Sequence, residues 1–213
     1  FLIVKDINQY EQLGTTIDDA LGEAFDKTAK MLDLGYPGGP NVEKFSKLGD
    51  ANYFKLPEPI INKAGCNLSF SGLKTAVLRE SKKIRENKKL KYNLAASFQY
   101  TVNKILYKKT KVAIEIFKKK TKKKNIQLVV AGGVAANQTI RKNLARLSDE
   151  INCTTIYPDL KFCGDNAAMI AWAGIKRFNK NLIDDISIPA RSRWPLDVKA
   201  PYMKGPGLKL DQF

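Results

Sequence analysis

Histidine is absent from this 213-residue chain. Its absence excludes a Ser-His or Cys-His catalytic pair, and any imidazole metal ligand, within these residues. Cysteine is scarce: the three thiols, Cys66, Cys153 and Cys163, are spaced too widely for a zinc site or a disulfide framework. We therefore expect free thiols and a reducing, cytoplasmic setting.

Long apolar runs are missing as well. No segment approaches the roughly 20 apolar residues that cross a bilayer, and the first residues lack the charged-then-apolar pattern of a signal peptide. We expect no membrane association. Because the chain begins at Phe1, without Met and directly on a β-strand pattern, we also expect a fragment whose fold starts upstream.

Positive charge is abundant, since 37 Lys and Arg against 21 Asp and Glu give a net charge of +16. The densest clusters of basic residues fall in segments 82–91, 108–111 and 118–124. A basic surface attracts polyanions, and RNA is the commonest of these in a cytoplasm. Few aromatic residues interleave with these lysines, so a solvated face remains open as the alternative to RNA contact.

Strand-like and helix-like patterns alternate along the chain. We expect a strand over 1–4 with a hairpin partner in 8–14, a helix capped by Asp18 and Asp19 and ending near Leu34, a helix over 41–48, an extended segment 67–70 leading into a helix from Ser71, a long helix over 93–120, a buried strand over 126–130 followed by a helix to about 147, a strand over 153–157 and a helix over 167–178. This alternation predicts an α/β fold with a mostly parallel or mixed sheet.

The first segment with candidate site chemistry is IDDALGEAFDKTAKMLDLGYPGGP, residues 17–40. It places the carboxylate of Asp26 on a helix that faces a bare turn containing Gly38 and Gly39. Such an arrangement suits a ribose hydroxyl or a phosphate, because glycine allows close backbone approach. A solvated aspartate beside an ordinary turn is the alternative interpretation.

Two further segments join it. In VVAGGVAAN, residues 129–137, Gly132 and Gly133 lie between a strand and a helix start, where an anion is favoured, and the amide of Asn137 is a candidate contact to a base or sugar. A tight turn that needs small residues explains the glycines equally simply. In CGDNAAMIA, residues 163–171, Asp165 stands at a helix entry and either caps the helix or binds a cation.

These three segments and NLSFSGLKTAV, residues 67–77, resemble in order and spacing the tRNA adenosine threonylcarbamoyltransferase family. The resemblance implies the second, C-terminal lobe of an actin/Hsp70/sugar-kinase-like fold, with a mixed sheet flanked by helices and an active site between two lobes. The lobe would span 1–193, with an irregular tail over 194–213. The implied activity is transfer of a threonylcarbamoyl group from threonylcarbamoyl-adenylate to adenosine 37 of tRNAs that read codons beginning with A.

The resemblance also implies roles for particular residues. Asp26, Gly39 and Asn137 match adenylate-binding positions, Glu43 falls where an Asp often serves the same pocket, Gly132 and Gly133 belong to the glycine motif beside it, and Asp165 matches a metal-ligating Asp. The implied metal is iron, with zinc as the alternative. The other two metal ligands of the family are histidines of an HxxxH motif, which this chain lacks. It also lacks the family's small-residue phosphate loop. Gly164 replaces the threonine of the usual CTDN pattern.

The implied partners are tRNA, TsaB-like and TsaE-like subunits, and a separately encoded first lobe. A rival hypothesis follows from the missing histidines and from the start of the chain within a strand pattern. In this hypothesis the chain is a noncatalytic truncated or split-gene fragment that at most binds a partner lobe or tRNA.

Overall fold

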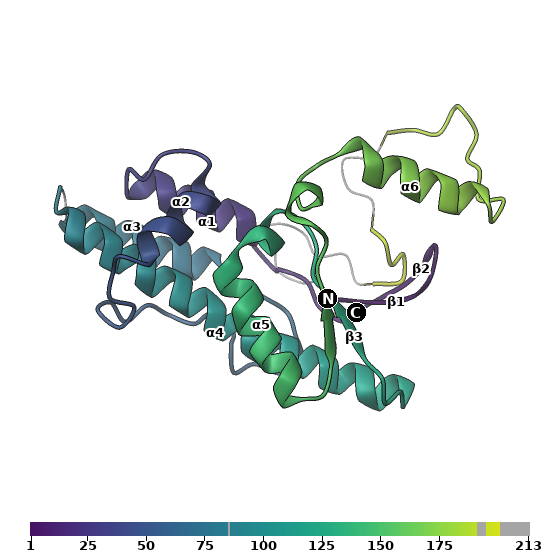
Figure 1. The fold of residues 1–213 in the computed structure, drawn as a ribbon, viewed down its shortest axis with the longest axis horizontal. Coiled ribbons are helices and arrows are strands. Elements are labelled where there is room, and N and C mark those ends of the chain that lie inside the picture. Colours follow the sequence, from purple (N-terminus) through teal and green to yellow (C-terminus); the bar gives the residue numbers. More distant parts are fainter. Residues whose placement is uncertain (85, 191–194, 201–213) are drawn as a thin grey trace.

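The structure is a computed structural model that describes residues 1–84, 86–190 and 195–200, and helices are its main regular elements (Figure 1). The elements are, in chain order, β1 (Leu2–Asp6), β2 (Gln9–Gln12), α1 (Leu21–Met31), α2 (Gly38–Ser46), α3 (Ser71–Ile84), α4 (Lys88–Thr121), β3 (Gln127–Val129), the 3-10 helix η1 (Gly133–Ala136), α5 (Gln138–Glu150), β4 (Thr154–Ile156), the 3-10 helix η2 (Leu160–Phe162) and α6 (Ala167–Phe178). β1 and β2 pair antiparallel, and β3 and β4 pair parallel. The predicted α/β class is confirmed; among the described residues the two strand orientations occur in two separate two-stranded sheets.

The 34-residue helix α4 is the centre of the hydrophobic core. It begins earlier than the sequence pattern suggested, because the Asn87 side chain accepts a hydrogen bond from the Leu90 amide, 3.1 Å away, and caps it. Phe98 is fully buried and meets Phe25 of α1 edge to face, with ring centroids 5.1 Å apart. Buried residues of α3 and α5 complete the same cluster. Helix α4 therefore fixes α1, α3 and α5 relative to one another.

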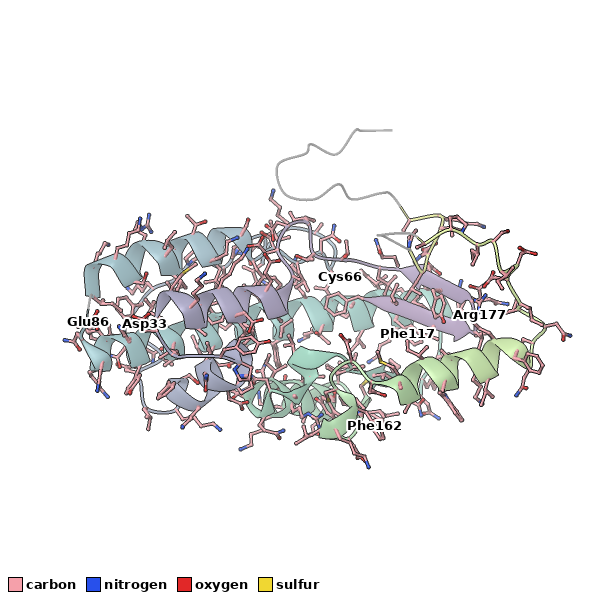
Figure 2. All side chains as sticks on the ribbon, turned by 90° about the horizontal axis from the view of Figure 1, so that it is seen from above. Asp33, Cys66, Glu86, Phe117, Phe162 and Arg177 are labelled. Carbon is pink, nitrogen blue, oxygen red and sulfur yellow. The ribbon has the colours of Figure 1, made fainter. Side chains whose placement is uncertain are left out.

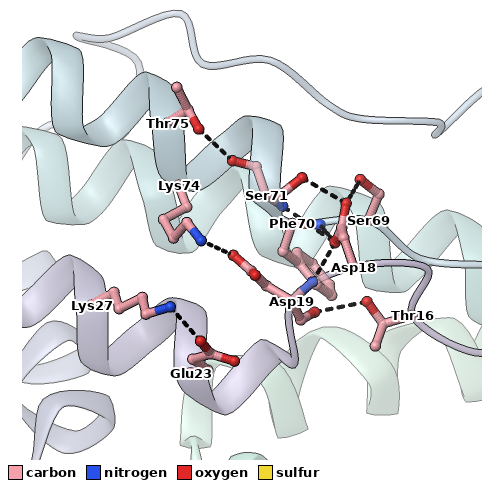
Figure 3. Close-up of polar contacts among 10 residues, drawn as sticks. All are labelled: Thr16, Asp18, Asp19, Glu23, Lys27, Ser69, Phe70, Ser71, Lys74 and Thr75. Atoms are coloured by element: carbon pink, nitrogen blue, oxygen red, sulfur yellow. Dashed lines mark hydrogen bonds and ion pairs between the residues drawn. The ribbon is translucent and has the colours of Figure 1, made fainter. Parts of the chain in front are cut away.

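The prediction that Asp18 and Asp19 cap their own helix is wrong. α1 begins at Leu21 after Ala20, without a side-chain cap. Asp18 instead accepts hydrogen bonds at the start of α3, from the Phe70 amide (2.8 Å) and the Ser71 hydroxyl (2.7 Å) among others (Figure 3). An aspartate reaches whichever helix N-terminus the fold brings near, and sequence spacing does not reveal a partner some fifty residues away.

The double glycine is also not the bare turn that we predicted. Gly38 and Gly39 form the first turn of α2, and Pro40 is tolerated there because amides of a first turn have no intrahelical partner. Gly38 is buried against α1: a Cβ atom on it would lie 2.5 Å from the Cα atom of Asp26. Glycine is therefore required for the close approach of α2 to α1.

The β3 strand is more exposed than its apolar sequence predicts. Ile126 before it is buried, but Val129 is 64% exposed, so the prediction of a buried strand is wrong. In the part of the chain that the structure describes, β3 pairs only with β4. The segment 67–70 makes one isolated bridge, between Leu68 and Thr16. The three cysteines are free thiols, as predicted.

Helix α6 lies apart from the helical body (Figure 1) and has no buried side chain. Its large apolar side chains, Met169, Ile170, Trp172, Ile175 and Phe178, are 45–67% exposed. In the chain, α6 comes directly after η2, whose last residue, Phe162, is labelled in Figure 2. Across residues 1–84, 86–190 and 195–200, no helix has the length and apolar character needed to cross a membrane. Most of the predicted irregular tail over 194–213 falls outside the described residues.

Candidate functional site

A hollow of about 540 Å³ lies where α1, α2 and the segment before α5 meet. Five of the predicted site residues line it: Asp26 from α1, Gly39 and Glu43 from α2, and Gly133 and Asn137 from the glycine-rich segment. Gly132 adjoins this wall without lining the hollow, and Asp165 does not line it. The fold thus gathers residues from segments that are 90 or more positions apart into one cavity.

Asp26 is exposed at the rim of the hollow. Its Oδ1 accepts a hydrogen bond from the Gly38 amide over 3.1 Å, which orients the carboxylate across the gap between α1 and α2. Among the described residues, Oδ2 has no hydrogen-bond partner. One oxygen of a fixed carboxylate therefore remains free to accept a hydroxyl donor.

Asn137 is 8% exposed and is held on both sides. Its Oδ1 caps α5 by accepting from the Ile140 amide at 2.9 Å, and its Nδ2 donates to Gln99 Oε1 at 2.8 Å. A carboxamide nitrogen carries two donors, so one N–H is left for a ligand. The side chain is thereby pre-oriented in the wall of the hollow.

Glu43 connects α2 to α5. Its Oε1 accepts from the Thr139 amide (3.1 Å) and the Thr139 hydroxyl (3.2 Å), at the first turn of α5. A carboxylate at that place is favoured by the unpaired amides of the helix start. The bond holds two walls of the hollow together.

The glycines leave the cavity open. A Cβ atom added to Gly39, Gly132 or Gly133 would meet no other atom within 4 Å. Gly132 also has a φ of +90°, a conformation that other residues rarely adopt. Gly39 lies in the first turn of α2, so its amide has no intrahelical partner and is available to a ligand.

Asp165 lies away from this hollow, exposed in the segment before α6. The capping role falls to its neighbour Asn166, whose Oδ1 accepts from the Met169 amide at 2.9 Å. No group of three His, Cys, Asp or Glu side chains able to hold a metal occurs within the described ranges. The described residues therefore do not form a complete metal site by themselves.

Part of the lysine-rich sequence has a structural role. Lys109 is 1% exposed, and its ammonium donates to the carbonyls of Lys63 (2.8 Å) and Gly65 (3.1 Å). Burial lowers the pKa of Lys109. Lys118 similarly donates to the Ile151 carbonyl at 3.1 Å. These two lysines connect α4 to other segments of the chain, and RNA contact by the remaining lysines stays a prediction.

Sequence reasoning missed Tyr36 as a site residue. It lines the hollow and is 88% exposed, between Gly35 and Pro37. The available signal for a site residue was an aromatic ring between glycine and proline, next to a candidate ligand-binding turn. Glycine and proline are typical of turns, and turns lie at the surface.

A sequence model of the family described as tRNA N6-adenosine threonylcarbamoyltransferase matches residues 1–172. The chain belongs to this family. Membership accounts for the α/β architecture, which is that of the actin-like and sugar-kinase-like folds.

Relatives bearing that name are similar over almost the whole chain. The one from Pelagibacter ubique is 53% identical over 210 residues, covering 99% of this chain and 58% of its own length. The ones from Rickettsia rickettsii and Rhodospirillum rubrum are 47% and 46% identical, covering 92% and 97% of this chain and 58% of their own lengths. The chain thus spans somewhat more than half of each threonylcarbamoyltransferase relative.

Proposed function

We propose that this chain is the second lobe of a tRNA threonylcarbamoyltransferase, which transfers the threonylcarbamoyl group of threonylcarbamoyl-adenylate to adenosine 37 of tRNAs that read codons beginning with A. The observation that carries the proposal is the convergence of Asp26, Gly39 and Asn137 on one hollow. Family membership supports it independently.

The hollow offers an adenylate three kinds of contact. The free oxygen of Asp26 accepts a hydrogen bond from a ribose hydroxyl. The amide of Gly39, at the start of α2, favours the negatively charged phosphate. The remaining N–H of Asn137 donates to the sugar or base. Each contact comes from a group that the fold already holds in place, so little conformational freedom is lost on binding.

The transfer forms a bond between adenosine N6 and the carbamoyl carbon and breaks the bond from that carbon to the phosphate oxygen, so that AMP leaves. We assign no general base to this chain. Its contribution is to hold the adenylate while N6 attacks, since a well-oriented pair of reactants removes much of the entropic part of the barrier.

The implied metal, iron or alternatively zinc, receives a single carboxylate from this chain, that of Asp165. Transition-metal sites use several ligands, so a complete site requires residues from outside these 213. In the proposal those residues belong to a first lobe, and TsaB-like and TsaE-like subunits complete the assembly.

A chimaeric enzyme tests the proposal. The segment of the Pelagibacter ubique relative that aligns with this chain is replaced by this chain, and the product is incubated with unmodified tRNA and threonylcarbamoyl-adenylate. Mass spectrometry of the tRNA nucleosides should show threonylcarbamoyladenosine, and Asp26→Ala should reduce its formation.

The rival hypothesis gives different results. A folded chimaera that neither binds adenylate nor forms product would favour a noncatalytic fragment that only binds a partner lobe or tRNA. Full activity of the 213-residue chain by itself would contradict the assignment as one lobe of two.

A further inference from the structure

A second hollow, of about 810 Å³, adjoins the adenylate hollow. Asp26 and Tyr36 line both cavities, so the two meet at these side chains. The remaining wall of the second hollow includes Lys27 and Lys30 on α1 and Gly35 in the turn before α2. Neither the family resemblance nor the adenylate proposal assigns this cavity a ligand.

We propose that the second hollow receives the acceptor nucleotide of the RNA, with the Tyr36 ring as its stacking platform and Lys30 as a phosphate contact. This inference rests on the proposed function, because it places the acceptor base beside the adenylate that the first hollow would hold.

The exposure of the Tyr36 side chain supports a stacking role for its ring. The side chain is 88% exposed, although a tyrosine ring is a large apolar surface. Neither an aromatic neighbour nor a hydrogen-bond partner for it occurs in the described part of the chain. Gly35, with a φ of +85°, and Pro37, whose ring restricts φ, flank it and limit its backbone. No described residue therefore stacks on either face of the ring, while the backbone that carries it is restricted.

The charge pattern is the second argument. Lys27 pairs with Glu23, and Asp33 pairs with Lys91 over 2.9 Å at the end of the molecule where Figure 2 labels Asp33 and Glu86. Lys30 is exposed and forms no ion pair with any described residue. Sites for single-stranded nucleic acid combine such a cation with an aromatic ring, because the ring stacks on a base while the cation binds the backbone.

The position of the hollow is the third argument. An enzyme that modifies a base takes that base out of its stack and holds it against aromatic side chains. N6 must approach the carbamoyl carbon to about 3–3.5 Å. A base on Tyr36 would lie next to an adenylate on Asp26, because both residues line both hollows.

Steady-state kinetics of the chimaera test the inference. Loss of one base–aromatic stack should raise the KM for tRNA roughly 5- to 150-fold in Tyr36→Ala, a larger factor than any change in the Kd for adenylate. Tyr36→Phe keeps the ring and should behave as the unsubstituted enzyme. Tyr100→Ala, which removes an exposed tyrosine of α4 outside both hollows, is the matched control. Lys30→Ala should reduce the slope of log Kd against log salt by about one.

A binding measurement covers the case of an inactive chimaera. An anticodon stem-loop with 2-aminopurine at position 37 should lose fluorescence on binding, and Tyr36→Ala should abolish that loss. Equal quenching with and without the ring, or a Tyr36→Ala variant that weakens adenylate binding but not RNA binding, would overturn the inference. Absence of adenylate binding in the unsubstituted chimaera would instead overturn the proposed function.

Discussion

The paired glycines at the start of α2 should respond to alanine in opposite ways. At Gly38, an added Cβ would lie 2.5 Å from the Asp26 Cα and 2.6 Å from its Oδ1. Helix backbone cannot yield as the end of a flexible side chain can, so we take the upper end of overpacking costs, about 3 kcal/mol. Alanine in a helix offsets roughly 0.5–1 kcal/mol of this relative to glycine.

The net effect of Gly38→Ala is therefore a loss of about 2 kcal/mol in the free energy of unfolding, or roughly 4–8 °C in Tm. Displacement of α2 should also break the hydrogen bond from the Gly38 amide to Asp26 and weaken adenylate binding. Gly39→Ala is the matched control for stability, because its Cβ would meet nothing within 4 Å.

Thermal unfolding of the chimaera, with and without AMP, separates the two effects. Gly39→Ala should keep or slightly raise the Tm while its methyl group, at the wall of the hollow, reduces the stabilisation by AMP. A Gly38→Ala protein as stable as Gly39→Ala would refute the claim that close approach of α1 and α2 requires glycine at position 38.

Three other perturbations test the supports of the site. Burial opposes ionisation of Asp18, but hydrogen bonds from Ser69, Phe70 and Ser71 outweigh burial and lower the pKa of this carboxyl. The free energy of unfolding should therefore fall as the pH drops below the ordinary pKa of 3.8. Asp18→Asn should flatten this pH dependence in urea titrations. Glu43→Ala removes the acceptor for both Thr139 donors and should lower the free energy of unfolding by about 1–3 kcal/mol. The control Glu23→Ala, at an exposed ion pair, should change the free energy of unfolding by about 0–1 kcal/mol. Equal effects of the two variants would contradict the claim that Glu43 connects α2 to α5. The isolated chain should self-associate in sedimentation velocity through the exposed apolar side chains of α6, and Trp172→Ser should reduce this; a monodisperse isolated chain would count against it.

Local patterns predicted the elements well where the partner of a residue lies nearby. The bounds of α6 follow from the Asn166 cap and the apolar run after it, and the β1–β2 hairpin follows from two short segments next to each other. Predictions failed where a distant segment decides. Asp18 has the spacing of a cap for α1, yet the fold brings the start of α3 to it.

The candidate site shows the same division. The types of residue at Asp26, Gly39 and Asn137 indicated a ligand, but their convergence depends on the packing of α1, α2 and α5 around α4. The hydrogen bond from Asn137 Nδ2 to Gln99 involves a residue on α4 that no sequence motif singled out. Tyr36 was likewise not recognised as a site residue: its glycine and proline neighbours were a signal, but nothing local shows that it lines two cavities.

Calorimetric titration of the chimaera with AMP measures whether the hollow between α1, α2 and the start of α5 binds an adenylate. We expect saturable binding at one site. Asp26→Asn should lose roughly 10-fold or more in affinity, because a charge-assisted hydrogen bond contributes about 1.5–3 kcal/mol, and Glu80→Gln on α3 should leave the affinity unchanged. No binding by the folded chimaera, or equal affinities for the unsubstituted and Asp26→Asn proteins, would contradict these expectations.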